Sequence, residues 1–230
     1  MLIRQLRLAP VGRTSLFAAL ALLSGGVSQA QITGSVWEYR IDPALGPNYV
    51  ATDAVLGYGD PSSPLYLGAP DATFNSGAIN YASDSTYTLA PFLNNPTFNN
   101  QSANFISNGG GAAGLDNMYF RFTGQVFLNA GNNSFVVGHD DGLQLNIDGI
   151  GLVVNAPGPT ALDNTPFNVN APSAGEYTFE LSYGECCGAP ADLNWDINNQ
   201  VVGVPDASAT MGLLGVGLTV LGAFGRRVKK

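Results

Sequence analysis

The chain has 230 residues, of which 45% are apolar and only 11% are charged, less than half the charged fraction of an average soluble domain. This composition excludes a charge-rich disordered chain and a coiled coil, and two Cys with one His exclude a disulfide-dense small domain and a His-built zinc site. Sixteen of the 17 acidic residues but only two of the nine basic ones lie between residues 31 and 203. We therefore expect this part of the chain to attract divalent cations and to have no nucleic-acid partner.

Residues 1–30 have the layout of a secretory signal peptide. Basic residues come first, an apolar stretch covers residues 16–23, and small residues end at Ala30. This order predicts export and cleavage by signal peptidase after Ala30. An uncleaved anchor helix is the alternative, which the short apolar stretch disfavours.

Residues 31–203 alternate apolar and polar side chains with a period of two, which predicts half-buried strands and no amphipathic helix. The clearest runs are residues 37–41, 118–122, 143–147, 177–183 and 193–197. Antiparallel strands with one apolar face must cover that face with a second sheet. The sequence therefore predicts one all-β domain at residues 31–203, an antiparallel two-sheet β-sandwich of the jelly-roll kind.

Residues 84–114 are rich in Asn, Ser, Gly and Pro. We interpret them as a loop-rich insertion in this domain. The alternative is a linker between two subdomains.

The hairpin at residues 135–149 carries the most informative chemistry. Its first strand ends at Asp140 and Asp141, and the chain turns at Gly142. Two neighbouring carboxylates repel each other unless a cation or hydrogen-bond donors neutralise them, and calcium binds six to eight oxygen atoms of the kind that Asp side chains and loop carbonyls supply. The pair is thus a candidate calcium site, with a solvated Asp-Asp-Gly turn as the alternative.

Cys186 and Cys187 are adjacent in a predicted loop. In an exported protein they could form a disulfide, remain thiols or cross-link to another chain. A disulfide between them would stiffen the loop and present sulfur atoms to a ligand. A metal site is not expected there, because two neighbouring Cys and one remote His do not complete a tetrahedral set.

Four other residues have an ordinary structural explanation. We expect His139 to be a solvated neighbour of the turn and not a general base, and Asp148 to belong to an Asp-Gly hairpin turn and not to a metal site. Trp37 and Trp195 could stack on sugars, but their places in alternating apolar runs favour core packing.

The order of motifs across residues 118–197 resembles the protective-antigen-type β-sandwich, a module of a bacterial toxin component, of fungal flocculin adhesins and of glycosidase inserts. The resemblance is carried by residues 140–142, 143–149, 175–185 and 188–189, and is looser over 31–117. In the sugar-binding members two Asp joined by a cis peptide hold a calcium ion that ligates sugar hydroxyls, and a later loop completes the site. The resemblance implies that Asp140 and Asp141 bind calcium, and that Glu185, Cys186 and Cys187 lie on the sugar-binding loop at residues 184–192.

Residues 204–230 combine Val204, Pro205 and Asp206 with an uncharged stretch at residues 207–224 and a terminal basic cluster. The stretch just reaches the length of a membrane span, and a permanent single-span anchor is one interpretation. The order also resembles an exosortase sorting tail of the PEP-CTERM class, more closely its VPDSG-CTERM variant, from which it departs at Ala207. That resemblance implies processing by an exosortase during export across a Gram-negative envelope.

These observations lead to one expected function and one alternative. We expect an exported cell-surface or extracellular-matrix module that binds carbohydrate, such as exopolysaccharide, with the help of calcium. The alternative is a non-catalytic structural protein of a biofilm matrix. An enzyme is not expected, because the sequence has no Ser nucleophile elbow, phosphate-binding Gly loop or zinc-ligand spacing.

Overall fold

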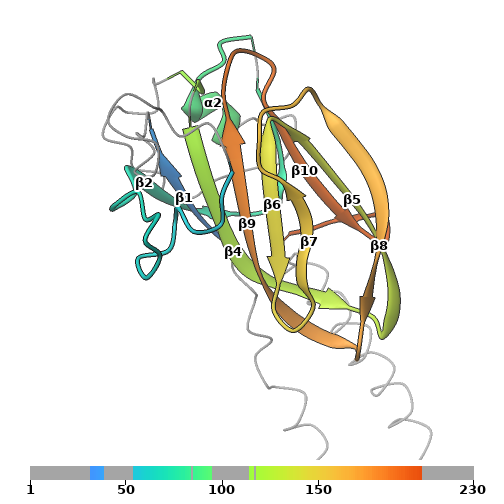
Figure 1. The fold of residues 1–230 in the computed structure, drawn as a ribbon. Helices are drawn as coiled ribbons and strands as arrows, with labels where there is room; N and C mark the ends of the chain where they lie inside the picture. The colour runs from blue at the N-terminus through green and yellow to red at the C-terminus, as the bar shows by residue number, and fades with distance from the viewer. Residues whose placement is uncertain (1–31, 39–53, 84, 95–113, 117, 204–230) are drawn as a thin grey trace, which may run out of the picture.

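The computed structural model describes residues 32–38, 54–83, 85–94, 114–116 and 118–203. Within them two antiparallel sheets pack face to face as a β-sandwich (Figure 1). The prediction of an all-β domain with two antiparallel sheets is thereby confirmed. The signal segment, most of residues 84–114 and the tail from Val204 onward lie outside the described residues, in which no helix is long and apolar enough to cross a membrane.

The first sheet has six strands, and every neighbouring pair is antiparallel. Its order is β2 (Ala72–Ser76), β1 (Ile32–Trp37), β4 (Met118–Leu128), β9 (Gly175–Glu185), β6 (Gly142–Ile147) and β7 (Gly151–Ala156). The second sheet has five strands, in the order β11 (Gln200–Val201), β10 (Asp192–Ile197), β5 (Gly131–Asp140) and β8 (Asp163–Ala171), and β3 (Asn80–Ala82) also pairs with β10.

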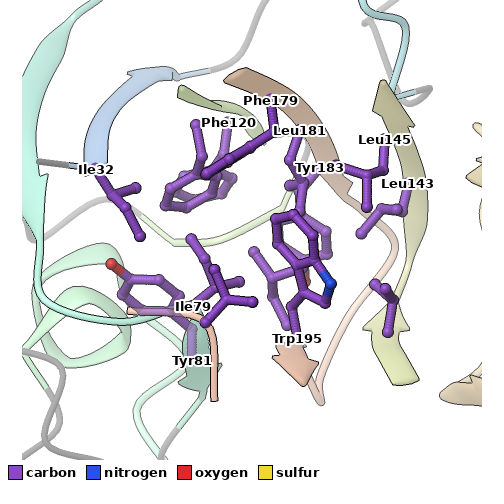
Figure 2. Close-up of a cluster of buried hydrophobic side chains, with 14 of the residues drawn as sticks. Ile32, Ile79, Tyr81, Phe120, Leu143, Leu145, Phe179, Leu181, Tyr183 and Trp195 are labelled. Atoms are coloured by element: carbon purple, nitrogen blue, oxygen red, sulfur yellow. The ribbon is translucent and has the colours of Figure 1, made fainter. Parts of the chain in front are cut away.

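Side chains from both sheets meet in one apolar core, part of which Figure 2 shows. Trp195 of β10 contacts Phe179 of β9 edge to face with ring centroids 4.9 Å apart. Phe120 and Tyr183 also lie together, with centroids 5.6 Å apart. Because each large apolar side chain contributes about 1.5–3 kcal/mol on full burial, this interdigitated layer is the main source of stability.

Two elements differ from the sequence prediction. The first strand begins earlier than the run predicted at residues 37–41: β1 extends from Ile32 to Trp37, and residues 39–41 lie outside the described residues. The apolar pattern of β1 is interrupted at Gly34, where a Cβ would lie 2.1 Å from the ring of Phe74. The Gly position is therefore filled by a side chain from the neighbouring strand, which local periodicity does not reveal.

The second difference is a short helix, α2 (Leu89–Leu93), in the segment predicted to be loop. Its buried residues Leu89, Phe92 and Leu93 belong to the main core. Phe92 packs against Tyr81 with ring centroids 5.4 Å apart. Five residues are too few to give a helical period in the sequence, but here they cover the end of the sandwich.

Candidate functional site

The site lies at the end of the sandwich where three connections meet, at the top of Figure 1. β5 of one sheet ends at Asp140, and β6 of the other sheet begins at Gly142, so Asp141 is the only residue between these two strands. The peptide bond between Asp140 and Asp141 is cis. A Cβ on residue 142 would lie 2.0 Å from the carbonyl oxygen of Pro157. Glycine is needed there because the β7–β8 loop crosses the turn at that distance.

Backbone N–H groups from two loops hold the carboxylate of Asp141. Thr160 of the β7–β8 loop donates to Oδ1 at 3.0 Å, and Cys186 of the β9–β10 loop donates to Oδ2 at 2.9 Å. The backbone N–H of Leu162 acts on the carboxylate of Asp140 and opposes the rise in its pKa. The two acidic side chains thus tie together the three connections that form this end of the molecule.

The main-chain carbonyls of the acidic pair are held as well. The hydroxyl of Tyr183 donates to the carbonyl oxygen of Asp140. Nδ1 of His139 lies 2.5 Å from the carbonyl oxygen of Asp141, and since a carbonyl can only accept, Nδ1 carries the proton. His139 has 3% of its surface exposed, so the expectation of a solvated turn neighbour is wrong.

Glu185, the last residue of β9, is fully buried. Tyr87 donates to its Oε1, and Tyr183 lies 2.5 Å from its Oε2. Burial raises the pKa of Glu185 to about 9, and the charges of Asp141 and Asp140 act in the same direction against the two phenol hydrogen bonds. Glu185 is therefore protonated and neutral at pH 7 in the metal-free protein.

The hydrogen bonds around Tyr183 lead to the same conclusion. Its hydroxyl has one hydrogen but faces two oxygens, the carbonyl of Asp140 and Oε2 of Glu185. If Glu185 carries a proton and donates it to Tyr183, the hydroxyl hydrogen of Tyr183 is free for Asp140. Every polar group in this hydrogen-bond network then has a partner.

Carboxylate oxygens of Asp140, Asp141 and Glu185 lie within 4.8 Å of one another. Burial and the neighbouring Asp141 raise the pKa of Asp140. Arg121 is the only Lys or Arg among the described residues, and it pairs with Glu180 at 2.9 Å on the six-stranded sheet. A hard divalent cation therefore fits this oxygen-rich cluster, in which the nearby sulfurs are not thiolates.

Cys186 and Cys187 form a disulfide in the β9–β10 loop. Cys186 is buried beside Asp141, whereas Cys187 faces solvent with a left-handed backbone at φ 69°. Next to this disulfide the chain has a second cis bond, between Ala189 and Pro190. The loop thus presents the sulfur of Cys187 at the rim of the acidic cluster.

The remaining sequence candidates do not join the site. Asp148 lies in the turn at the other end of β6, where Gly149 has a φ of 77°. Trp195 belongs to the main core, and Trp37 packs with Tyr119 in a smaller cluster. Glu185 was grouped with the sugar contacts, but its fully buried side chain has no surface for a ligand. We assign it to the support of the acidic pair.

Sequence reasoning missed Thr160, Leu162 and Tyr87, as well as a polar pair beside Asp140. Asp192 lies opposite Asp140 in the pairing of β10 with β5. Nδ2 of Asn194 donates to Oδ1 of Asp192 at 2.8 Å, and burial raises the pKa of Asp192. The alternation along residues 193–197 indicates that the side chains of Asp192 and Asn194 point outward from the sheet. Only the pairing register shows that they lie beside the acidic pair.

No family model and no curated protein match the chain. Among solved structures, the PA14 sugar-binding domain from an RTX adhesin superposes with a TM-score of 0.51 at 20% identity, covering 76% of this chain and 98% of that one. The PA14 domain of the MpAFP antifreeze protein gives a TM-score of 0.51 at 18% identity, covering 75% and 86%. The chain has the fold of PA14 domains. This PA14 fold agrees with the resemblance carried by the sequence motifs.

Proposed function

We propose that this PA14-fold domain is a calcium-dependent carbohydrate-binding module, exported to the cell surface or extracellular matrix, where it binds polysaccharide. One observation carries the proposal: the carboxylates of Asp140 and Asp141 converge at the junction of three loops, and no described residue is a basic partner for them. The sugar-binding domain of the RTX adhesin, which has the same fold, supports it.

Asp140 and Asp141 would hold the calcium ion. Each oxygen of Asp141 accepts one backbone N–H, which leaves a second lone pair on each for a cation. When bound, calcium supplies open coordination positions to which sugar hydroxyls can bind as oxygen ligands. The protein's own part is to fix the two carboxylates through the N–H groups of Thr160, Leu162 and Cys186.

Two exposed apolar groups flank the acidic pair and suit the C–H faces of a sugar ring. Leu162, whose N–H acts on the carboxylate of Asp140, has 50% of its surface exposed. Cys187 carries the outward half of the disulfide on the opposite loop. A sugar seated between them would contact carboxylate-bound calcium through its hydroxyls and apolar side chains through its carbons.

The burial of Glu185 favours a binding role over hydrolysis. A glycosidase needs two carboxyl groups that flank the scissile bond, one of them protonated. Glu185 carries the proton here, but it has no exposed surface.

For the route of export we propose the signal segment at residues 1–30 and the sorting tail at 204–230, processed by signal peptidase and an exosortase, with the tail in the membrane at least transiently.

The experiment is titration calorimetry with calcium, followed by a glycan array in calcium and in chelator. We expect calcium binding and calcium-dependent glycan binding for the wild-type domain, and loss of both for Asp140→Asn and Asp141→Asn. Asp148→Asn, the same change in the turn at the far end of β6, is the matched control. Thermal unfolding of each variant separates loss of the site from loss of the fold.

Equal glycan signals in calcium and in chelator would refute the calcium-dependent mechanism. If no glycan binds, and assembly of the protein into matrix is unchanged in Asp140→Asn and Asp141→Asn, the structural matrix protein is the correct alternative.

A further inference from the structure

The outer face of the five-stranded sheet continues from the acidic pair along β5, β8 and β10, which lie side by side in Figure 1. Pairing registers place its outward residues in rows. Asp140 lies opposite Asp192 in the first row, and Gly138 lies between Asn194 and Asn164 in the second. The candidate site is therefore one end of a longer polar surface.

Further rows follow along β8, which is an edge strand. Asn168 pairs with Ser134, and Asn170 pairs with Asn132. All four of these side chains are exposed, whereas the side chains of Val169 and Ala171, which alternate with Asn168 and Asn170 along β8, are buried. We call Asn194, Asn164, Asn168 and Asn170 the amide track.

Strand stability does not explain the amide track. Asn is depleted in strands, and Gly weakens a central strand. A Cβ on Gly138 would lie 2.1 Å from Oδ1 of Asn164 and 2.4 Å from Nδ2 of Asn194. The missing side chain thus allows amides from both neighbouring strands to lie across β5, next to the acidic pair. Asn168 and Asn170 make no side-chain hydrogen bond to another described residue, so their donors and acceptors are available.

The chemistry of this face selects hydroxyl groups and rejects anions. Amides both donate and accept hydrogen bonds, and Pro166, opposite Val136, adds an apolar row between them. β3, β5, β8, β10 and β11 contain no Lys or Arg. With Asp192 and Asp196 facing outward, the surface repels uronate, sulfate and phosphate polymers.

The length of the face exceeds one sugar ring. Rows recur every second residue, about 6.8 Å apart, so the five rows from Asp140 to Asn132 extend over roughly 27 Å. We propose that the amide track binds an internal segment of a neutral, hydroxyl-rich polysaccharide, whose chain runs from the calcium site along β8. This inference rests on the proposed function and names its ligand class: a neutral long-chain glycan and not a single terminal sugar.

The test uses the full domain with neutral glucan, mannan and galactan oligosaccharides, from monosaccharide to octasaccharide, in millimolar calcium. We expect affinity to rise with chain length. In Asn168→Ala with Asn170→Ala, octasaccharide affinity should fall about tenfold, because the two amides no longer form hydrogen bonds with the bound glycan. Calcium affinity and monosaccharide binding should not change, because both residues are remote from the acidic pair.

Asn146→Ala with Asn155→Ala, two outward amides of the six-stranded sheet, is the matched control and should retain full octasaccharide affinity. If the double Ala variant unfolds, Asn168→Ser with Asn170→Ser replaces it. Calcium-dependent binding that is independent of chain length, or equal binding of a polyuronate, overturns this inference but leaves the proposed function intact. If no oligosaccharide of any length binds in a calcium-dependent way, the proposed function itself fails, and this inference with it.

Discussion

Removal of one buried hydroxyl tests how the core supports the acidic pair. Tyr183 is fully buried, and its hydroxyl faces the carbonyl of Asp140 and Oε2 of Glu185. In Tyr183→Phe the ring contacts with Phe92 and Phe120, at centroid distances of 6.2 and 5.6 Å, are retained. The substitution therefore deletes the polar link and leaves the packing in place.

The expected loss of stability follows from the groups that lose their partner. An unsatisfied buried polar group costs about 1–3 kcal/mol, and two such groups remain after the substitution. We expect the free energy of unfolding to fall by about 2–6 kcal/mol, which corresponds to a melting temperature roughly 4–24 °C lower for a domain of this size. Calcium affinity should fall too, because the carbonyl of Asp140 is no longer anchored.

Two Tyr→Phe variants on the same scaffold serve as controls. The hydroxyl of Tyr177, in an exposed part of the same strand, donates to the carbonyl of Ser173 at 2.9 Å, and its loss should cost below about 1 kcal/mol. The buried hydroxyl of Tyr119 lies 2.6 Å from Oγ of Ser182, and the ring belongs to the smaller cluster with Trp37, so its loss should reduce stability without a change in calcium affinity. Urea unfolding in chelator and calcium calorimetry measure the two effects. If Tyr183→Phe is no more destabilising than Tyr177→Phe, or if Tyr119→Phe weakens calcium binding equally, the reasoning is refuted.

Three other predictions concern packing and the rim of the site. Phe92→Ala should lower the free energy of unfolding by about 3–5 kcal/mol, because its ring fills the core beneath α2; a loss below 1 kcal/mol in urea would show that α2 is not part of the core. Gly138→Ala should cost less than about 1 kcal/mol, because the added Cβ would lie 2.1 Å from Oδ1 of Asn164, which is the far end of an exposed side chain that can turn away, and because Gly loses more backbone entropy than Ala on folding; a loss above about 3 kcal/mol in urea would contradict this. Replacement of Cys186 and Cys187 by Ala should leave the melting temperature in chelator nearly unchanged, because the disulfide closes no chain loop. The same replacement should weaken calcium binding several-fold in calorimetry, because the N–H donor to Asp141 is held less firmly. Unaltered calcium affinity would argue against that role of the disulfide.

The strands that could be predicted are those whose inward faces are uniformly apolar. Residues 143–147 and 193–197 alternate without interruption, and both form strands with buried apolar positions. β1 and β8 were not recognised, because Gly34 is covered by Phe74 and β8 has Pro166 and exposed amides on its outward face. In both strands the pattern depends on a partner strand or on an outer surface, which the local sequence does not contain.

The acidic pair could be identified because its two members are adjacent in the chain. Its supports could not, because the N–H groups of Thr160, Leu162 and Cys186 are present in almost any residue and leave no trace in side-chain identity. Tyr87 is separated by 98 residues from the Glu185 oxygen to which it donates. Only the pairing of β4, β6 and β9 and the position of α2 bring these groups together.

The location of the charges supports the proposal that a cation binds at this end of the sandwich, where the carboxylates are held in place. Backbone N–H groups fix the carboxylates of Asp140 and Asp141 without neutralising them, whereas a Lys or Arg partner would stabilise the pair and exclude an ion. Glu185 behind the pair carries no charge at pH 7, so it adds hydrogen bonds without adding repulsion. The negative charge at this end therefore lies on Asp140 and Asp141, with Asp192 beside them on β10, and it is this charge that would attract a cation.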